Sequence, residues 1–184
     1  MINTRIVKRY ALALFGSLKH DQIEQVYQDL LSVQAIIRQS KDLRTFLNSP
    51  VVPHNKKQEI IKEIFGKTIG QTAQDFLYLI AEKRRESMLS EIIDSFENLY
   101  NMQMNLLPVD FTTAVVLDAD LQQKLAHTVA DVTNNSVISK FMVNPELPIG
   151  LIANTTSAVG IGLAAKFPQL AGTMLFDSGG KEID

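Results

Sequence analysis

The sequence changes its apolar pattern once, near Leu107-Pro108, and this change limits the folds open to the chain. Before it, apolar residues recur every three or four positions, the spacing that places side chains on one helix face. After it, the segment from Val109 to Leu117 is rich in β-branched residues, which favour strands. The pattern therefore predicts a mainly α protein, with an N-terminal six-helix bundle over residues 1–105 and a small α/β domain over residues 106–184.

The helices predicted for the first domain are joined by short connections, which favours antiparallel packing of neighbours. Asp21 is expected to cap the second helix and Gly66 to end the fourth. The last turn of the fifth is expected to carry Lys83, Arg84 and Arg85, whose charges suit the negative end of the helix dipole. The predicted ranges are 4–19, 21–39, 42–47, 55–65, 72–85 and 88–104.

The second domain is predicted to alternate strands and helices. A strand over 109–117 is followed by a helix over 118–133 and a second strand over 137–143, which ends at Asn144-Pro145. Short strands are expected at 151–154 and 158–161, and a last helical segment at 163–170. This order predicts a small α/β unit.

Charge also differs between the two predicted domains. Residues 1–105 carry 14 Lys+Arg and 12 Asp+Glu, whereas residues 106–184 carry 4 and 8. The total of −2 gives no indication of a nucleic acid or anionic membrane partner. The longest uncharged stretch, Leu147 to Ala165, is 19 residues long but includes Pro148 and several polar residues, whereas a bilayer helix needs ~20 mostly apolar residues. A soluble protein is therefore expected.

Two glycine-containing phrases resemble nucleotide-binding motifs. Gly66-Lys67-Thr68 matches the end of the phosphate-binding loop, but that pattern needs glycine where Ile61 stands and a strand before it. Gly160 to Ala165 matches the alanine-ended dinucleotide fingerprint, but only nineteen residues follow, too few for the rest of a Rossmann unit. We interpret the first phrase as a helix end and the second as tight turns between short strands.

Other candidates for chemistry are also weak. The chain has no cysteine, and His20, His54 and His127 fall in separate segments without metal-binding or catalytic spacing. A basic stripe is interleaved with acids and has few aromatic residues, which argues against nucleic acid; it consists of Lys56, Lys57, Lys62 and Lys67. The sequence predicts no catalytic residue, no metal site and no cofactor.

Three phrases, in matching order and spacing, resemble the delta/oligomycin-sensitivity-conferral subunit family of F-type ATP synthases. They are KRYALALF, FLNSPVVPHNKKQEIIKEIFG and FLYLIAEKRRESMLSEIIDSFENLYN, which together fall within residues 8–101. The later phrase FMVNPELPIGLIA is a poorer match, because the family's paired glycines are Ile149-Gly150 here. In the following stretch the family's acidic and serine positions are missing, and Pro168 enters the last helix.

The resemblance implies a non-catalytic peripheral-stalk (stator) subunit. In that family the N-terminal bundle binds the N-terminal helix of an alpha subunit, and the C-terminal domain meets the b-subunit stalk. The complex lies on the cytoplasmic face of the cell membrane, which this subunit meets only indirectly, and a bacterial source is expected. The family's alpha helix lies between the first and fifth helices. The residues expected to bind it are Tyr10, Ala13, Leu14, Leu79 and Ala81, with Arg84 and Arg85 facing acids at the rim.

Two other functions remain open on the residues alone. One is a generic helical adaptor, which would not co-purify with ATP synthase subunits. The other is a small enzyme that holds a nucleotide phosphate in the 158–165 turn, which would retain labelled nucleotide.

Overall fold

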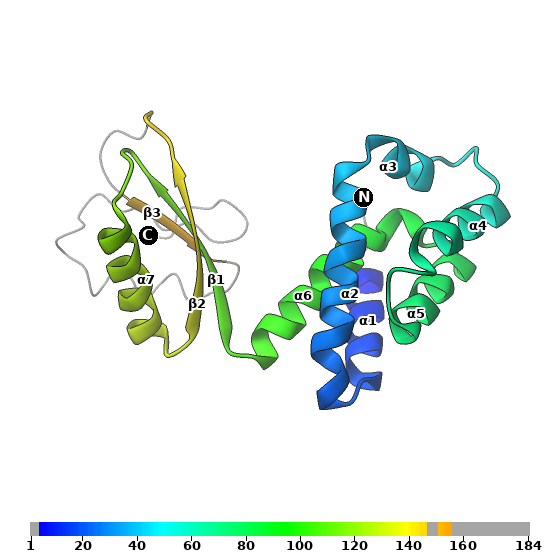
Figure 1. Ribbon diagram of the computed structural model, residues 1–184, viewed down its shortest axis with the longest axis horizontal. Helices are drawn as coiled ribbons and strands as arrows, with labels where there is room; N and C mark the ends of the chain where they lie inside the picture. The colour runs from blue at the N-terminus through cyan, green and yellow to red at the C-terminus, as the bar shows by residue number, and fades with distance from the viewer. Residues whose placement is uncertain (1–3, 147–150, 156–184) are drawn as a thin grey trace. The chain divides into compact units, whose positions relative to one another are not determined.

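The structure, a computed structural model, describes residues 4–146 and 151–155. It confirms a mainly α chain, with six α-helices followed by a small α/β part (Figure 1). The chain divides between Tyr100 and Asn101 into two compact units. The helices before the first strand are α1 (Thr4–Ser17), α2 (His20–Gln39), α3 (Lys41–Asn48), α4 (His54–Phe65), α5 (Gln71–Glu82), the short 3-10 helix η1 (Glu86–Met88) and α6 (Leu89–Gln103).

All six α-helices of the first unit contribute to one apolar core. In α1 the buried residues Val7, Ala11 and Leu14 follow the helical repeat. The largest fully buried side chains of this core come from α2, α4, α5 and α6, and each contributes roughly 1.5–3 kcal/mol through burial. They are Leu30, Ile61, Phe65, Leu77, Ile80, Leu89, Ile92, Ile93 and Phe96.

Several helix ends differ from the sequence prediction; α1, for example, ends at Ser17 and not at residue 19. Helix α2 begins at His20, so Lys19 and not Asp21 is the N-cap; the Lys19 N–H donates to Gln22 Oε1 at 3.1 Å. Helix α5 ends at Glu82 because Arg84 adopts the left-handed φ of 56°, which stops the helical hydrogen bonding. Lys83, Arg84 and Arg85 therefore follow α5 instead of forming its last turn. Gly66 follows the last residue of α4, as predicted.

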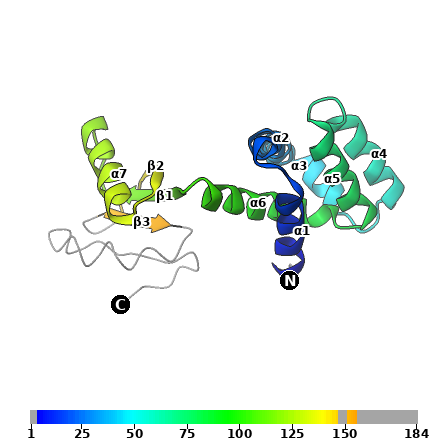
Figure 2. The same cartoon turned by 90° about the horizontal axis from the view of Figure 1, so that it is seen from below.

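The second unit contains a sheet of three described strands in the order β2-β1-β3. Strand β1 (Leu106–Thr113) pairs in parallel with β2 (Ser136–Val143) and antiparallel with β3 (Leu151–Thr155). Helix α7 (Ala119–Thr133) connects β1 to β2 and covers one face of the sheet (Figure 2). That face carries a separate core of Leu107, Val109, Phe111 and Val129, in which the rings of Phe111 and Phe141 stack at 4.7 Å.

Strand β1 starts and ends earlier than the predicted range of 109–117. Pro108 lies inside it, although proline cannot donate a ladder hydrogen bond. At Pro108 the strand pairs with β2, opposite Ile138. The predicted strand over 158–161 and the helical segment over 163–170 lie outside the described residues.

Candidate partner-binding surface

The first nucleotide-like phrase does not have the structure of a phosphate-binding loop. Gly66-Lys67-Thr68 follows helix α4, whereas a phosphate-binding loop follows a strand. The stretch Gly160 to Ala165 lies outside the described residues. Over residues 4–146 and 151–155, no group of three or more His, Asp or Glu side chains is placed to hold a metal ion.

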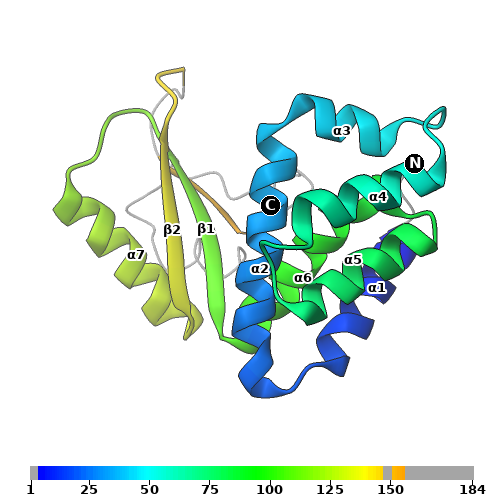
Figure 3. The same ribbon diagram turned by 45° about the vertical axis from the view of Figure 1, so that its right-hand side comes forward.

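Helices α1 and α5 lie next to each other and share the core (Figure 3). Tyr10 of α1 lies near Lys83, the residue that directly follows α5. Tyr10 and Ala13 are three residues apart on α1 and so share a helix face, and the N–H of Lys83, just after α5, donates to the Leu79 carbonyl oxygen at 3.0 Å. We call these four residues the α1–α5 surface.

The α1–α5 surface combines a small side chain with two larger apolar ones. Ala13 is exposed, Leu79 is 40% exposed, and Tyr10 is half-buried against the core. Two other residues predicted to bind a partner, Leu14 and Ala81, are 6% and 0% exposed and belong to the core of the first unit. Both are buried and are not accessible in the isolated chain.

The end of the α1–α5 surface that includes Lys83 is basic. Arg84 is exposed and Arg85 is half-buried. A hydrogen bond from Lys83 Nζ to Glu82 Oε1 at 2.9 Å raises the pKa of Lys83, and the nearby Tyr10 adds a smaller contribution in the same direction. The basic residues predicted at the rim thus lie where α5 ends.

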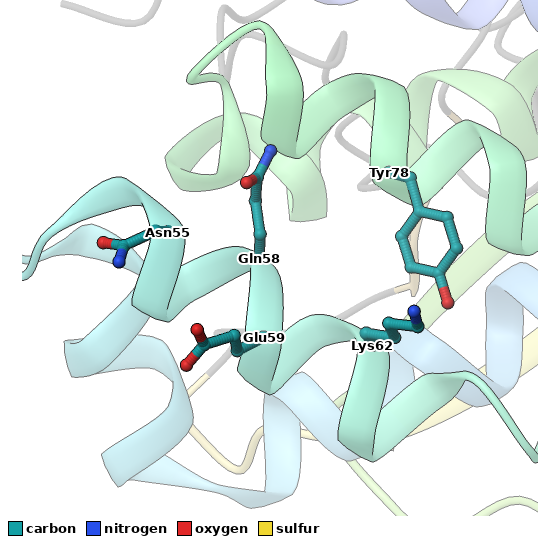
Figure 4. A pocket seen from close by; sticks show the side chains of 5 residues that line it. All are labelled: Asn55, Gln58, Glu59, Lys62 and Tyr78. Carbon is teal, nitrogen blue, oxygen red and sulfur yellow. The ribbon is translucent and has the colours of Figure 1, made fainter.

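A cavity of about 360 Å³ lies between α4 and α5 (Figure 4). Tyr78 comes from α5, and the other lining residues come from α4: Asn55, Gln58, Glu59 and Lys62. Glu59 and Lys62 are exposed, and Glu59 pairs with Lys56 at 2.9 Å. The surroundings of these groups are open to water, so the cavity holds no buried charge that would bind a ligand strongly.

Sequence reasoning missed a buried charge cluster beside the end of α5. Lys57, a member of the basic stripe, is only 7% exposed, and Glu86 is 6% exposed. Lys57 Nζ donates to the Leu47 carbonyl oxygen at 2.7 Å and lies 3.6 Å from Glu86 Oε1. His54 Nδ1 lies 3.3 Å from the same Glu86 oxygen. The sequence around Lys57 does not indicate that its side chain is buried, because its partner Glu86 is 29 positions away.

A helical bundle followed by a small α/β unit is the fold class that the structure defines. The chain belongs to the family of the ATP synthase delta (OSCP) subunit, whose family model matches residues 6–160.

Relatives that match this chain over most of their length are ATP synthase delta subunits. The ATP synthase subunit delta of Chlorobium chlorochromatii is 31% identical over 144 residues, which is 78% of this chain and 80% of the relative. That of Desulforudis audaxviator is 31% identical over 153 residues, 83% of this chain and 84% of the relative. The fold is similar to a chain in the cryo-EM structure of the Toxoplasma gondii mitochondrial ATP synthase hexamer, with a TM-score of 0.65 and 23% identity, covering 79% of this chain and 82% of that one.

Family membership establishes the general function of the chain. It is a non-catalytic component of the peripheral stalk of F-type ATP synthase. In the described part of the chain, no helix is both long and apolar enough to cross a membrane.

Proposed function

We propose that the helical bundle of residues 1–105 binds the N-terminal helix of an ATP synthase alpha subunit on the α1–α5 surface. The observation that carries this proposal is Ala13, which is exposed on α1 three residues from the half-buried Tyr10, while Leu79 of α5 is 40% exposed. An amphipathic helix commonly binds where two helices present apolar side chains. The small side chain of Ala13 permits close approach of the partner backbone, and Tyr10 and Leu79 supply apolar contact area.

The basic end of this surface supports an electrostatic contribution to the same contact. Exposed charges such as Arg84 add little affinity but select the partner's orientation and speed association. Acidic residues on the partner helix would face Arg84 and the half-buried Arg85.

The proposal assigns a separate partner to the second unit. Residues 106–184 meet the b subunits of the stalk, so that the chain links the catalytic head to the membrane-anchored part of the enzyme. The complex then lies on the cytoplasmic face of the cell membrane, with this subunit attached only through its partners. Support comes from the bacterial origin of the relatives and from the separate core of the second unit.

Calorimetric titration of the full chain with a synthetic peptide of the alpha subunit's N-terminal residues tests the first assignment. Saturable one-to-one binding is expected, and it should vanish when the peptide's apolar face is replaced by serine. Binding that persists with the serine peptide would be non-specific, and no binding to either peptide would refute the proposal. Co-purification of the tagged chain from detergent-solubilised membranes should recover b subunits, and their absence would refute the second assignment.

A further inference from the structure

The tyrosines are the side chains of this sequence that lose a single electron most easily. The sequence has no cysteine and no tryptophan, whose thiol and indole groups would otherwise compete for a one-electron oxidant. Its methionines are oxidised by gain of an oxygen atom, which yields the sulfoxide. An oxidant that removes single electrons is therefore expected to act on tyrosine, and the four tyrosines are Tyr10, Tyr27, Tyr78 and Tyr100.

Tyr27 and Tyr100 are the two tyrosines that the fold brings together. Tyr27 lies on α2 and Tyr100 on α6, and their ring centroids are 3.9 Å apart with 12° between the ring planes. At this separation the carbons of the two rings are in van der Waals contact. Within residues 4–146 and 151–155, neither Tyr10 nor Tyr78 stacks on another ring in this way. A radical formed on Tyr27 or Tyr100 thus has a second phenol directly beside it.

A carboxylate accepts a hydrogen bond from each of the two hydroxyl groups. The Tyr27 hydroxyl donates to Glu97 Oε1 at 3.3 Å, and the Tyr100 hydroxyl donates to Glu24. Burial, followed by the charge of Glu97, raises the pKa of Tyr27 to about 12, so this phenol is protonated at neutral pH and loses its proton when an electron is removed. The hydrogen bond from Tyr100 lowers the pKa of Glu24, which is therefore ionised at neutral pH. Each phenol thus has a base in place to take its proton.

We propose that Tyr27 and Tyr100 form an oxidative modification site, at which a one-electron oxidant couples the two rings into dityrosine. The pair can be reached from water, because Tyr27 is half-buried and Glu24 is exposed, although Tyr100 itself is only 8% exposed. Two molecules of oxidant, such as the nitrogen dioxide radical, each take one electron and become the anion, here nitrite. The two hydroxyl protons pass to Glu97 and Glu24.

The coupling step joins the two phenoxyl radicals that result. An ortho carbon of the Tyr27 ring bonds to an ortho carbon of the Tyr100 ring, and the hydrogen on each of these carbons then moves to the phenol oxygen of its own ring. The product contains one new C–C bond and has lost two hydrogen atoms in all, which left as two electrons and two protons.

The new bond joins α2 to α6 inside the first unit. Tyr27 and Tyr100 lie far apart in sequence, so the cross-link closes a long loop and restricts the unfolded chain more than the folded one. Oxidation at this site therefore stabilises the helical bundle instead of disrupting it, and the urea midpoint of the cross-linked chain should exceed that of the unmodified chain.

Photo-oxidation of the full chain in dilute solution tests the site. Irradiation of ruthenium tris(bipyridyl) with persulfate produces ruthenium(III), a one-electron oxidant. The expected product is a monomer on a denaturing gel, with dityrosine fluorescence and a mass lower by two hydrogen atoms. After digestion with trypsin, the cross-linked species should contain residues 20–38 joined to residues 86–124. A cross-link between other tyrosines, or dityrosine only in dimers of the chain, would overturn the proposal.

Phenylalanine variants supply the matched controls. Tyr27→Phe and Tyr100→Phe each keep the stacked ring but remove the phenol, and each should lose the cross-link. The double variant Tyr10→Phe/Tyr78→Phe keeps the stacked pair and should give the natural yield. Irradiation of the natural chain in concentrated urea should also lose the cross-link, because the contact between the rings depends on the fold. A cross-link that persists in either single variant or in urea, or an unchanged urea midpoint after cross-linking, would contradict the proposal.

Glu97→Gln tests the carboxylate that accepts the proton of Tyr27. The amide oxygen still accepts a hydrogen bond but takes no proton at neutral pH, so the initial rate of cross-linking should fall while the far-UV circular dichroism stays unchanged. Glu63→Gln, at an exposed acid on α4, serves as the control and should keep the natural rate. An unchanged rate for Glu97→Gln would show that the proton passes directly to water and would overturn this role of Glu97.

Discussion

Ala13 is the residue on which the proposed contact depends most directly. Because its side chain is exposed, Ala13→Leu should occupy the volume of the partner helix and leave the free bundle intact. Affinity for the alpha-subunit peptide should fall by ~1–3 kcal/mol through overpacking, roughly tenfold to more than a hundredfold, as measured by calorimetry.

Two alanines provide matched controls for this substitution. Ala11 is completely buried on the same helix, so Ala11→Leu should destabilise the free bundle by ~1–3 kcal/mol in urea denaturation. Ala35 is exposed on α2, so Ala35→Leu should change neither stability nor affinity appreciably. If Ala13→Leu lowers the stability of the free bundle as much as it weakens the complex, Ala13 packs inside the domain and the surface lies elsewhere.

Asp29 is a second residue whose role depends on a partner that is distant in sequence. Its buried carboxylate accepts from the Gly70 N–H at 2.9 Å, at the N-cap of α5, and from Gln25 Nε2 at 3.1 Å. Asp29→Ala should remove the cap and lower the free energy of unfolding by about 1–2 kcal/mol. The measurement is the urea midpoint of the full chain.

Asp75 is the control for Asp29, because it is exposed and bonds only within α5, to Gln71 at 2.7 Å. Asp75→Ala should change stability by less than ~0.5 kcal/mol. Equal effects of the two substitutions would mean that the bond across to Gly70 contributes nothing.

At the scale of single residues, Leu14 and Ala81 show what could not be predicted from the sequence. The apolar repeat correctly placed both on helices, but the expected partner surface included them although both are core residues. On a short helix, neighbouring apolar stripes differ by only a small rotation, and the repeat does not say which neighbour helix covers which stripe. Lys57, Asp29 and Glu86 were missed because burial of a charge depends on partners that lie far away in sequence.

At the scale of elements, α2 and α6 are joined by a pair of stacked tyrosines. The rings of Tyr27 and Tyr100 are 3.9 Å apart and nearly parallel. The Tyr27 hydroxyl donates to Glu97 Oε1 at 3.3 Å, and the Tyr100 hydroxyl donates to Glu24. Burial, followed by the nearby charge of Glu97, raises the pKa of Tyr27 to about 12.

This shift predicts a loss of stability in strong alkali. Tyrosine in the unfolded chain ionises near pH 10, so the unfolded state releases its proton first. The stability that Tyr27 contributes is complete below about pH 10 and is lost as the pH rises through about 12. Urea midpoints measured across that window should fall more steeply for the natural chain than for Tyr27→Phe, which keeps the ring but cannot ionise. Parallel curves for the two proteins would contradict the assignment.

Element types were predictable, whereas several boundaries were not. The helical repeat located all six α-helices of the first unit because each presents a long apolar face to one core. The end of α5 was misplaced because the left-handed backbone of Arg84 carries no glycine or asparagine signal. The start of β1 was misplaced because proline usually marks a break in a strand, whereas Pro108 lies inside β1 and pairs with Ile138 of β2.

At the scale of the whole molecule, the amino-acid pattern and the fold both divide the chain into two parts, at slightly different positions. The apolar pattern changes near Leu107-Pro108, and the compact units divide between Tyr100 and Asn101, within α6. A proposed division at residue 105 keeps α6 complete. Both divisions keep in the first part the residues that α6 supplies to the first core, Leu89, Ile92, Ile93 and Phe96.

The fragment of residues 1–105 should therefore fold alone, because every helix that contributes to the first core is present in it. Circular dichroism should show a strongly helical species that melts cooperatively, and its affinity for the alpha-subunit peptide should match that of the full chain within about twofold.

A fragment ending at residue 88 is the control. Without α6 it leaves the apolar faces of α1 and α2 uncovered, notably Phe15, whose ring lies 5.5 Å from that of Phe96. The shorter fragment should lack a cooperative transition, as expected when much of a core is missing. An unfolded fragment of residues 1–105 would show that the first unit does not fold alone, and a shorter fragment that melts cooperatively would show that the unit does not depend on α6.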